Sequence, residues 1–83
     1  MNIAVLGSGT IGQSWCALFL AAGHRVVAYD PDPATEERII AFVDASRPAL
    51  ESLGYQFAGS TEQFRFSRSA IGAVEDAQFI QEN

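Results

Sequence analysis

Three glycines near the amino end of this 83-residue chain, Gly7, Gly9 and Gly12, follow the pattern G-x-G-x-x-G. Glycines at this spacing let backbone N–H groups approach and hold an anion such as a pyrophosphate, and no lysine is needed. We expect Gly7 to permit a tight turn and Gly9 to leave room for the ligand. Gly12 would let a helix lie close to the preceding strand.

The residues between these glycines are predicted to supply the donors. Backbone N–H groups around Thr10 and Ile11 would point at the phosphates from the start of a helix, where the helix dipole also favours negative charge. The hydroxyls of Ser8 and Thr10 are further candidate donors. The alternative is purely structural, because glycines at a strand–helix junction also form a tight turn that binds nothing.

An acid, Asp30, follows Gly12 by 18 residues, close to the roughly 20 residues that separate the glycines from the ribose-binding acid in dinucleotide sites. Its carboxylate would accept hydrogen bonds from the adenosine ribose hydroxyls and would repel a 2′-phosphate. No arginine occurs in residues 31–37 to receive such a phosphate. The pattern therefore predicts NAD rather than NADP, with capping of the turn before Pro31 as the alternative role of Asp30.

Other residues of chemically active types have simpler explanations. His24, the single histidine, follows a helix-ending glycine, so we expect it in an exposed turn at the end of the sheet away from the phosphates. Cys16 and Trp15 fall within an apolar helix, where packing is the expected role. Glu82 and Asn83 end a strand on the ligand side, and a terminal polar cluster is the simpler interpretation. We predict no catalytic residue and no metal site in this chain.

The elements that must position these residues alternate between strand and helix. Apolar and alternating runs predict strands at 3–6, 25–29, 64–67 and 79–82. Helices are expected at 10–22, after residue 32, and within 68–77, and residues 54–60 show no clear pattern. Asp32 is expected to cap the second helix and Pro33 to begin it. Pro48 would kink that helix or end it early.

This alternation predicts an α/β fold, a partial Rossmann fold with a parallel sheet of order 3-2-1-4 and helices on its faces. The ligand would bind at the carboxyl ends of strands 1 and 4. Strand 4 would form an open edge that aggregates or is covered by another chain.

Composition narrows the classes of partner. Ten acidic residues against five arginines give a net charge of −5, which argues against nucleic acid and anionic membrane as partners. The length implies a single domain, and the lone cysteine rules out an intrachain disulfide. Apolar stretches are too short to span a membrane, so we expect a cytoplasmic protein.

Two stretches carry a resemblance to a known family: "IAVLGSGTIGQSWCALFLAAGHRVVAYD" and "DAQFIQEN". They resemble the N-terminal NAD-binding domain of the L-3-hydroxyacyl-CoA dehydrogenase superfamily. The likeness is closest to the branch that includes L-gulonate 3-dehydrogenase (lambda-crystallin) and carnitine dehydrogenase. The resemblance implies NAD as cofactor, oxidation of a 3-hydroxyl to a ketone, and cofactor contacts by Gly7, Gly9, Gly12 and Asp30.

The resemblance also implies that most of the enzyme lies elsewhere. The family's general-base histidine, its glutamate partner and the helical domain that shapes the substrate pocket and forms the homodimer all lie downstream. We therefore expect residues 1–83 to be the N-terminal part of a dinucleotide-binding domain, inactive alone, in an enzyme for a small hydroxy acid or an acyl-CoA. The alternative is a free-standing, non-catalytic nucleotide-binding or structural module, because His24 is the only evident base and is misplaced.

Overall fold

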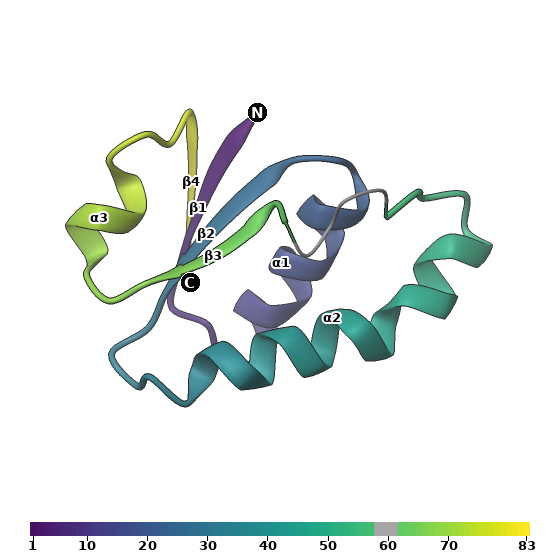
Figure 1. Ribbon diagram of the computed structural model, residues 1–83, viewed down its shortest axis with the longest axis horizontal. Coiled ribbons are helices and arrows are strands. Elements are labelled where there is room, and N and C mark those ends of the chain that lie inside the picture. Colours follow the sequence, from purple (N-terminus) through teal and green to yellow (C-terminus); the bar gives the residue numbers. More distant parts are fainter. Residues whose placement is uncertain (58–61) are drawn as a thin grey trace.

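The computed structural model describes residues 1–57 and 62–83, which alternate between strand and helix (Figure 1). In chain order the elements are β1 (Asn2–Leu6), α1 (Thr10–Ala21), β2 (Arg25–Tyr29), α2 (Thr35–Ser52), β3 (Phe64–Ser67), α3 (Ala70–Val74) and β4 (Phe79–Glu82). The strands form one parallel sheet of order β3-β2-β1-β4. The predicted α/β fold and strand order are confirmed.

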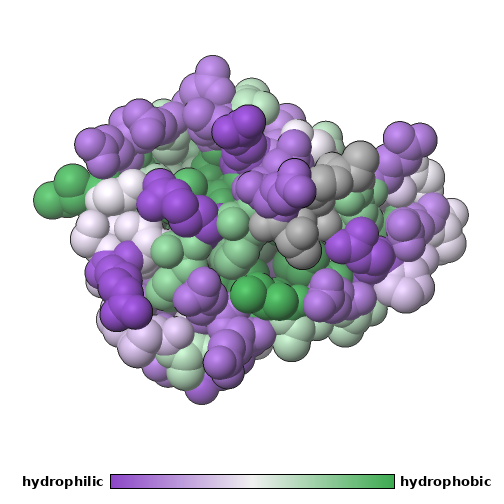
Figure 2. All heavy atoms as spheres, viewed as in Figure 1, coloured by the Kyte–Doolittle hydropathy of each residue, from purple (hydrophilic) through white to green (hydrophobic). Residues whose placement is uncertain are grey.

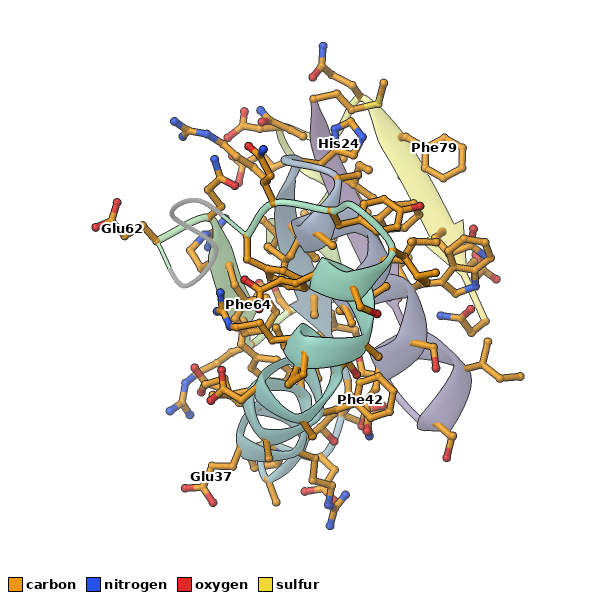
Figure 3. All side chains as sticks on the ribbon, turned by 90° about the vertical axis from the view of Figure 1, so that its right-hand side faces the viewer. His24, Glu37, Phe42, Glu62, Phe64 and Phe79 are labelled. Carbon is orange, nitrogen blue, oxygen red and sulfur yellow. The ribbon has the colours of Figure 1, made fainter. Side chains whose placement is uncertain are left out.

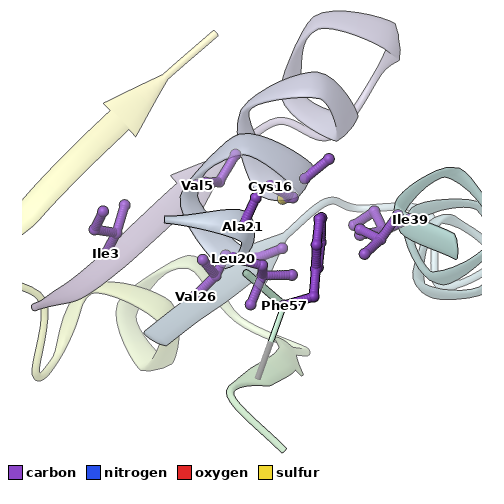
Figure 4. Packing of buried hydrophobic residues seen from close by; sticks show 11 residues of the cluster. Ile3, Val5, Cys16, Leu20, Ala21, Val26, Ile39 and Phe57 are labelled. Atoms are coloured by element: carbon purple, nitrogen blue, oxygen red, sulfur yellow. The ribbon is translucent and has the colours of Figure 1, made fainter. Parts of the chain in front are cut away.

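The sheet lies between two layers of helix. Figure 1 shows α1 and α2 on one side of the strands and α3 on the other. Successive side chains of a strand point to opposite faces, so alternate residues of β1 and β2 meet α1 and α2. The cluster of buried residues on that side comprises Ile3, Val5, Cys16, Ala17, Leu20, Ala21, Val26, Ala28, Ile39, Val43 and Phe57 (Figure 4). This core fixes the strand ends that carry the glycines and the acid.

The start of α2 differs from the prediction. Asp32 and Pro33 do not cap and begin the helix, because a turn comes first: the Thr35 N–H donates to the Asp32 carbonyl at 3.1 Å. Asp32 Oδ1 accepts from the N–H of Ala34 at 3.0 Å. Ala34 is the N-cap residue, and the helix begins at Thr35. Asp32 therefore stabilises the turn that precedes the helix.

Pro48 is predicted to kink α2 or to end it early, and the early end is wrong. The helix continues through Pro48 to Ser52. A proline removes one backbone donor, but apolar side chains anchor the helix to the core on both sides of it. Ile39 and Val43 are buried before the proline, and Leu50 packs against the same cluster after it. Tertiary packing therefore outweighs the local cost of the proline.

The surface carries apolar side chains among polar ones. Figure 2 shows hydrophilic residues spread over the face drawn in Figure 1, with hydrophobic residues between them. At the β4 edge, Phe79 and Ile80 each remain 47% exposed, although Phe79 contacts Phe19 edge-on at 6.3 Å. Among the described strands β4 pairs only with β1, so the predicted open edge is present. Aggregation at this edge, or its covering by another chain, stays a prediction. Within residues 1–57 and 62–83, no helix is long and apolar enough to cross a membrane.

Candidate functional site

The turn that joins β1 to α1 depends on two glycines. Gly7 has a φ of +82°, in the left-handed region that glycine adopts without strain, and its N–H donates to the Tyr29 carbonyl at 2.9 Å. A Cβ added at Gly12 would stand 2.2 Å from the Gly7 carbonyl oxygen. Only glycine therefore lets α1 begin this close to the end of β1.

The start of α1 presents backbone donors without helical partners. Gly9 is the N-cap residue, and the Gln13 N–H donates to its carbonyl at 2.9 Å. The N–H groups of Thr10, Ile11 and Gly12 precede that bond and have no acceptor inside the helix. Apart from its chain neighbours, no described heavy atom lies within 4 Å of where a Cβ of Gly9 would stand. This end of the helix can receive an anion, aided by the helix dipole.

Asp30 directly follows β2 and lies against the glycine turn. Its Oδ2 accepts from the Ser8 N–H at 3.0 Å, and its Oδ1 accepts from the Asp32 N–H at 2.9 Å. These two backbone hydrogen bonds, that of Ser8 first, hold the pKa of Asp30 below its ordinary value. The carboxylate is therefore ionised at neutral pH, and each oxygen keeps lone-pair capacity for a further donor such as a ribose hydroxyl.

Ser8 is held at the end of β2 by hydrogen bonds within the chain. The residue is only 2% exposed, and its hydroxyl donates to the Tyr29 carbonyl at 3.4 Å. Its N–H is bound to Asp30. The hydroxyl is buried against the end of β2, and its service to a ligand stays a prediction. Thr10 is exposed and stays the predicted hydroxyl donor.

The cation of Arg38 lies near Asp30. Arg38 directly follows residues 31–37, in which no arginine occurs. Arg38 approaches Asp32, with 3.4 Å between Nη1 and Oδ2, and its positive charge also helps to lower the pKa of Asp30. The side chains of Arg38 and Asp32 are 60% and 52% exposed, so the pair contributes little to stability. Helix α2 turns this side chain back towards the end of β2, which inspection of residues 31–37 alone could not reveal.

Asn83, directly after β4, reaches the same turn. Its N–H donates to the Leu6 carbonyl at 3.1 Å. Its side-chain Nδ2 donates to the Gly7 carbonyl at 2.8 Å and to the Leu6 carbonyl at 3.3 Å. The sequence placed Asn83 at the ligand edge as part of a polar cluster but missed this contact. The predicted neighbourhood of strands 1 and 4 was the available signal, and the direction of the side chain was not encoded locally.

The remaining candidates lie away from the glycine turn. His24 is half-buried rather than fully exposed: its Nδ1 lies 3.1 Å from the Met1 amino group, and its ring meets Phe19 edge-on. Figure 3 shows His24 close to Phe79, where β4 begins, so it lies at the end of the sheet opposite the turn. Cys16 is fully buried, and burial raises the pKa of its thiol to about 12.

The predicted packing role of Trp15 agrees with its ring contacts, since its ring stacks on that of Phe19 with 5.2 Å between the ring centroids. Among the residues that the structure describes, no group of three histidine, cysteine or acidic side chains is arranged to hold a metal ion.

Comparisons with known proteins match almost the whole chain. Residues 2–83 match the family model for the NAD-binding domain of 3-hydroxyacyl-CoA dehydrogenase. The L-carnitine dehydrogenase of Nocardiopsis dassonvillei is 43% identical over 82 residues, covering 99% of this chain and 25% of that protein. The L-carnitine dehydrogenase of Pseudomonas aeruginosa is 45% identical over 82 residues, covering 99% and 26%. The chain spans about a quarter of the length of these relatives.

A solved structure shares both the fold and part of the sequence. The 5-formyl-3-hydroxy-2-methylpyridine 4-carboxylic acid 5-dehydrogenase, an NAD⁺-dependent dismutase, superposes with a TM-score of 0.80 at 34% identity. The match covers 99% of this chain and 27% of that one. The strand order described above thus belongs to a fold that this dehydrogenase shares.

Proposed function

The chain belongs to the family of NAD-binding domains of 3-hydroxyacyl-CoA dehydrogenase, and on that premise we propose that it is the cofactor-binding part of a dehydrogenase acting on a 3-hydroxyl group. The observation that carries the proposal is the glycine turn, with open amides at the start of α1 and an ionised Asp30 beside them. NAD, when bound, supplies the acceptor for the hydride that leaves the hydroxyl-bearing carbon.

The residues of the turn fit the two polar parts of a dinucleotide. The N–H groups of Thr10, Ile11 and Gly12 donate to the pyrophosphate, and the absence of a side chain at Gly9 lets it approach the backbone. Asp30 accepts hydrogen bonds from the ribose hydroxyls and repels a 2′-phosphate. These roles are proposals, and they predict a preference for NAD over NADP.

We propose that the base for the hydroxyl proton lies in a further part of a longer protein. His24 is at the opposite end of the sheet (Figure 3), and the relatives are about four times as long as this chain. That longer protein would act as a cytoplasmic homodimer. Its substrate would be a small 3-hydroxy acid, such as the carnitine named for the relatives, or a 3-hydroxyacyl-CoA.

Calorimetric titration of NAD and NADP tests the cofactor assignment. We expect the unsubstituted protein to bind NAD more tightly than NADP. Asp30→Ala should weaken the binding of NAD about tenfold and so reduce the difference between the two affinities. Asp44→Ala, which removes one exposed carboxylate of α2, serves as the control for net charge and should leave the preference unchanged. Equal affinities in the parent would contradict the role of Asp30.

Arg38 provides a second arm of the same experiment. With Asp30 replaced by alanine, the Arg38 guanidinium is the nearby cation that could receive a 2′-phosphate, so Arg38→Ala in that background should remove any gain in NADP affinity.

The claim that catalysis lies elsewhere is tested separately. Turnover of a 3-hydroxy acid by residues 1–83 alone would contradict it, and so would a complete protein without a histidine–glutamate pair beyond residue 83.

A further inference from the structure

We infer that Asn83 is a positioning residue, which together with Asp30 locks a single peptide group of the glycine turn, the one joining Gly7 to Ser8. The Asn83 amide donates to the carbonyl of this peptide at 2.8 Å, and the Asp30 carboxylate accepts from its N–H at 3.0 Å. The inference rests on the proposed function, because it concerns how the turn is prepared for a dinucleotide.

The geometry of the peptide makes this a two-sided clamp. All described peptide bonds are trans, so the carbonyl and the N–H of one peptide point in opposite directions. β1 lies between β2 and β4 in the sheet. Asp30 follows β2 and Asn83 follows β4, so each can reach one end of the Gly7–Ser8 peptide. Rotation of this peptide would break both bonds, so each opposes it and the two together oppose it more strongly than either alone.

The clamp also depends on Gly12. A Cβ added at Gly12 would stand 3.2 Å from Asn83 Nδ2, closer than an ordinary van der Waals contact. The side-chain amide thus occupies space that exists because Gly12 lacks a side chain. Gly12 therefore serves a second purpose beyond the close start of α1, since it admits the donor that holds the turn.

The consequence for binding is preorganisation. Fixing the Gly7–Ser8 peptide fixes the direction in which the chain enters α1, and with it the open N–H groups at the helix start. A turn held in this way loses less conformational freedom when a pyrophosphate binds. Asp30 accordingly has two roles, one towards the ribose and one towards its own backbone.

Asn83→Leu in the complete protein tests the inference, because leucine is close in shape to asparagine and equally uncharged but cannot donate a hydrogen bond. Asn2→Leu is the matched control: Asn2 Nδ2 donates to the Asp76 carbonyl at 3.4 Å at the opposite end of the sheet. We expect Asn83→Leu to weaken NAD and ADP-ribose about tenfold, the equivalent of one hydrogen bond. Adenosine, which lacks the pyrophosphate, should bind as before, and Asn2→Leu should leave all three affinities unchanged.

Hydrogen exchange of the Ser8 amide supplies a readout that needs no ligand. We expect this amide to exchange faster in Asn83→Leu and at the parental rate in Asn2→Leu. Unchanged exchange and unchanged NAD affinity in Asn83→Leu would overturn the clamp, and so would an equal loss of adenosine binding. Failure of the parent to bind NAD would instead count against the proposed function, while the exchange rates would still decide on the clamp. If Asn83→Leu does not fold, Asn83→Asp, which keeps the shape and loses the donor, takes its place in the exchange measurement.

Discussion

Replacement of Gly12 by alanine tests the steric core of the glycine turn. The added Cβ would stand 2.2 Å from the Gly7 carbonyl oxygen, and real Cβ contacts stay above 3.0 Å, so the start of α1 must move away by about 0.8 Å. The opposing atom belongs to the backbone and cannot rotate aside. Overpacking of this kind costs up to about 3 kcal/mol, and the better helix propensity of alanine returns about 1 kcal/mol.

The net destabilisation is therefore about 2 kcal/mol, the difference between these two effects. For a domain of this size, that corresponds to a fall in the thermal unfolding midpoint of about 8–16 °C. Differential scanning calorimetry or thermal circular dichroism without ligand measures it. An unchanged midpoint in Gly12→Ala would contradict the steric conflict with Gly7, because the helix start would then have room for a methyl group.

Gly9→Ala is the matched substitution at the neighbouring glycine of the pattern. Gly9 has a φ of −68° and open space around its missing Cβ, so alanine fits without strain and stability should change by less than about 1 kcal/mol. The methyl group would instead stand where the pyrophosphate approaches, and we expect NAD affinity to fall at least about tenfold. Unaltered NAD affinity in Gly9→Ala would show that the phosphates do not lie at this helix start.

Two further predictions concern single side chains. Burial raises the pKa of the Cys16 thiol to about 12. Thiol reagents should therefore leave the native protein unmodified at neutral pH and should react once guanidinium chloride unfolds it. Rapid labelling of the native protein would contradict this burial. Because backbone N–H groups lower the pKa of Asp30 in the folded state, its contribution to stability is present above the unfolded pKa of about 3.9 and is lost as pH falls through the folded value. Asp30→Asn should therefore flatten the fall in urea midpoint below about pH 4, and an identical acid profile would contradict the hydrogen bonds to Ser8 and Asp32.

The local pattern of the chain was enough to predict the elements near the site. The run that ends at Leu6, the glycines that follow and the acid after Tyr29 are features of short segments, and each depends on neighbours in the sequence. The left-handed φ of Gly7 and the contact between Gly12 and Gly7 belong to the same class. The conformation of this turn follows from steric contacts of the backbone within six residues, so it could be predicted from the local sequence.

Predictions failed where packing across the chain competes with local preference. Pro48 breaks an isolated helix, yet α2 continues because Leu50 beyond it packs against the core. The burial of the Ser8 hydroxyl against the Tyr29 carbonyl is likewise absent from the sequence motif. In both cases the outcome depends on burial, which a window of neighbouring residues does not contain.

The amino-acid sequence was sufficient to predict the family, the order of strands and helices, and the positions of Gly7, Gly9, Gly12 and Asp30. The contacts that hold the turn in place became visible in the folded structure. Asn83 meets Gly7 from 76 residues away, and Asp30 meets Ser8 from 22 residues away. The predicted strand order makes these residues neighbours, but the strand register and the direction of each side chain are set by the packing of the whole sheet.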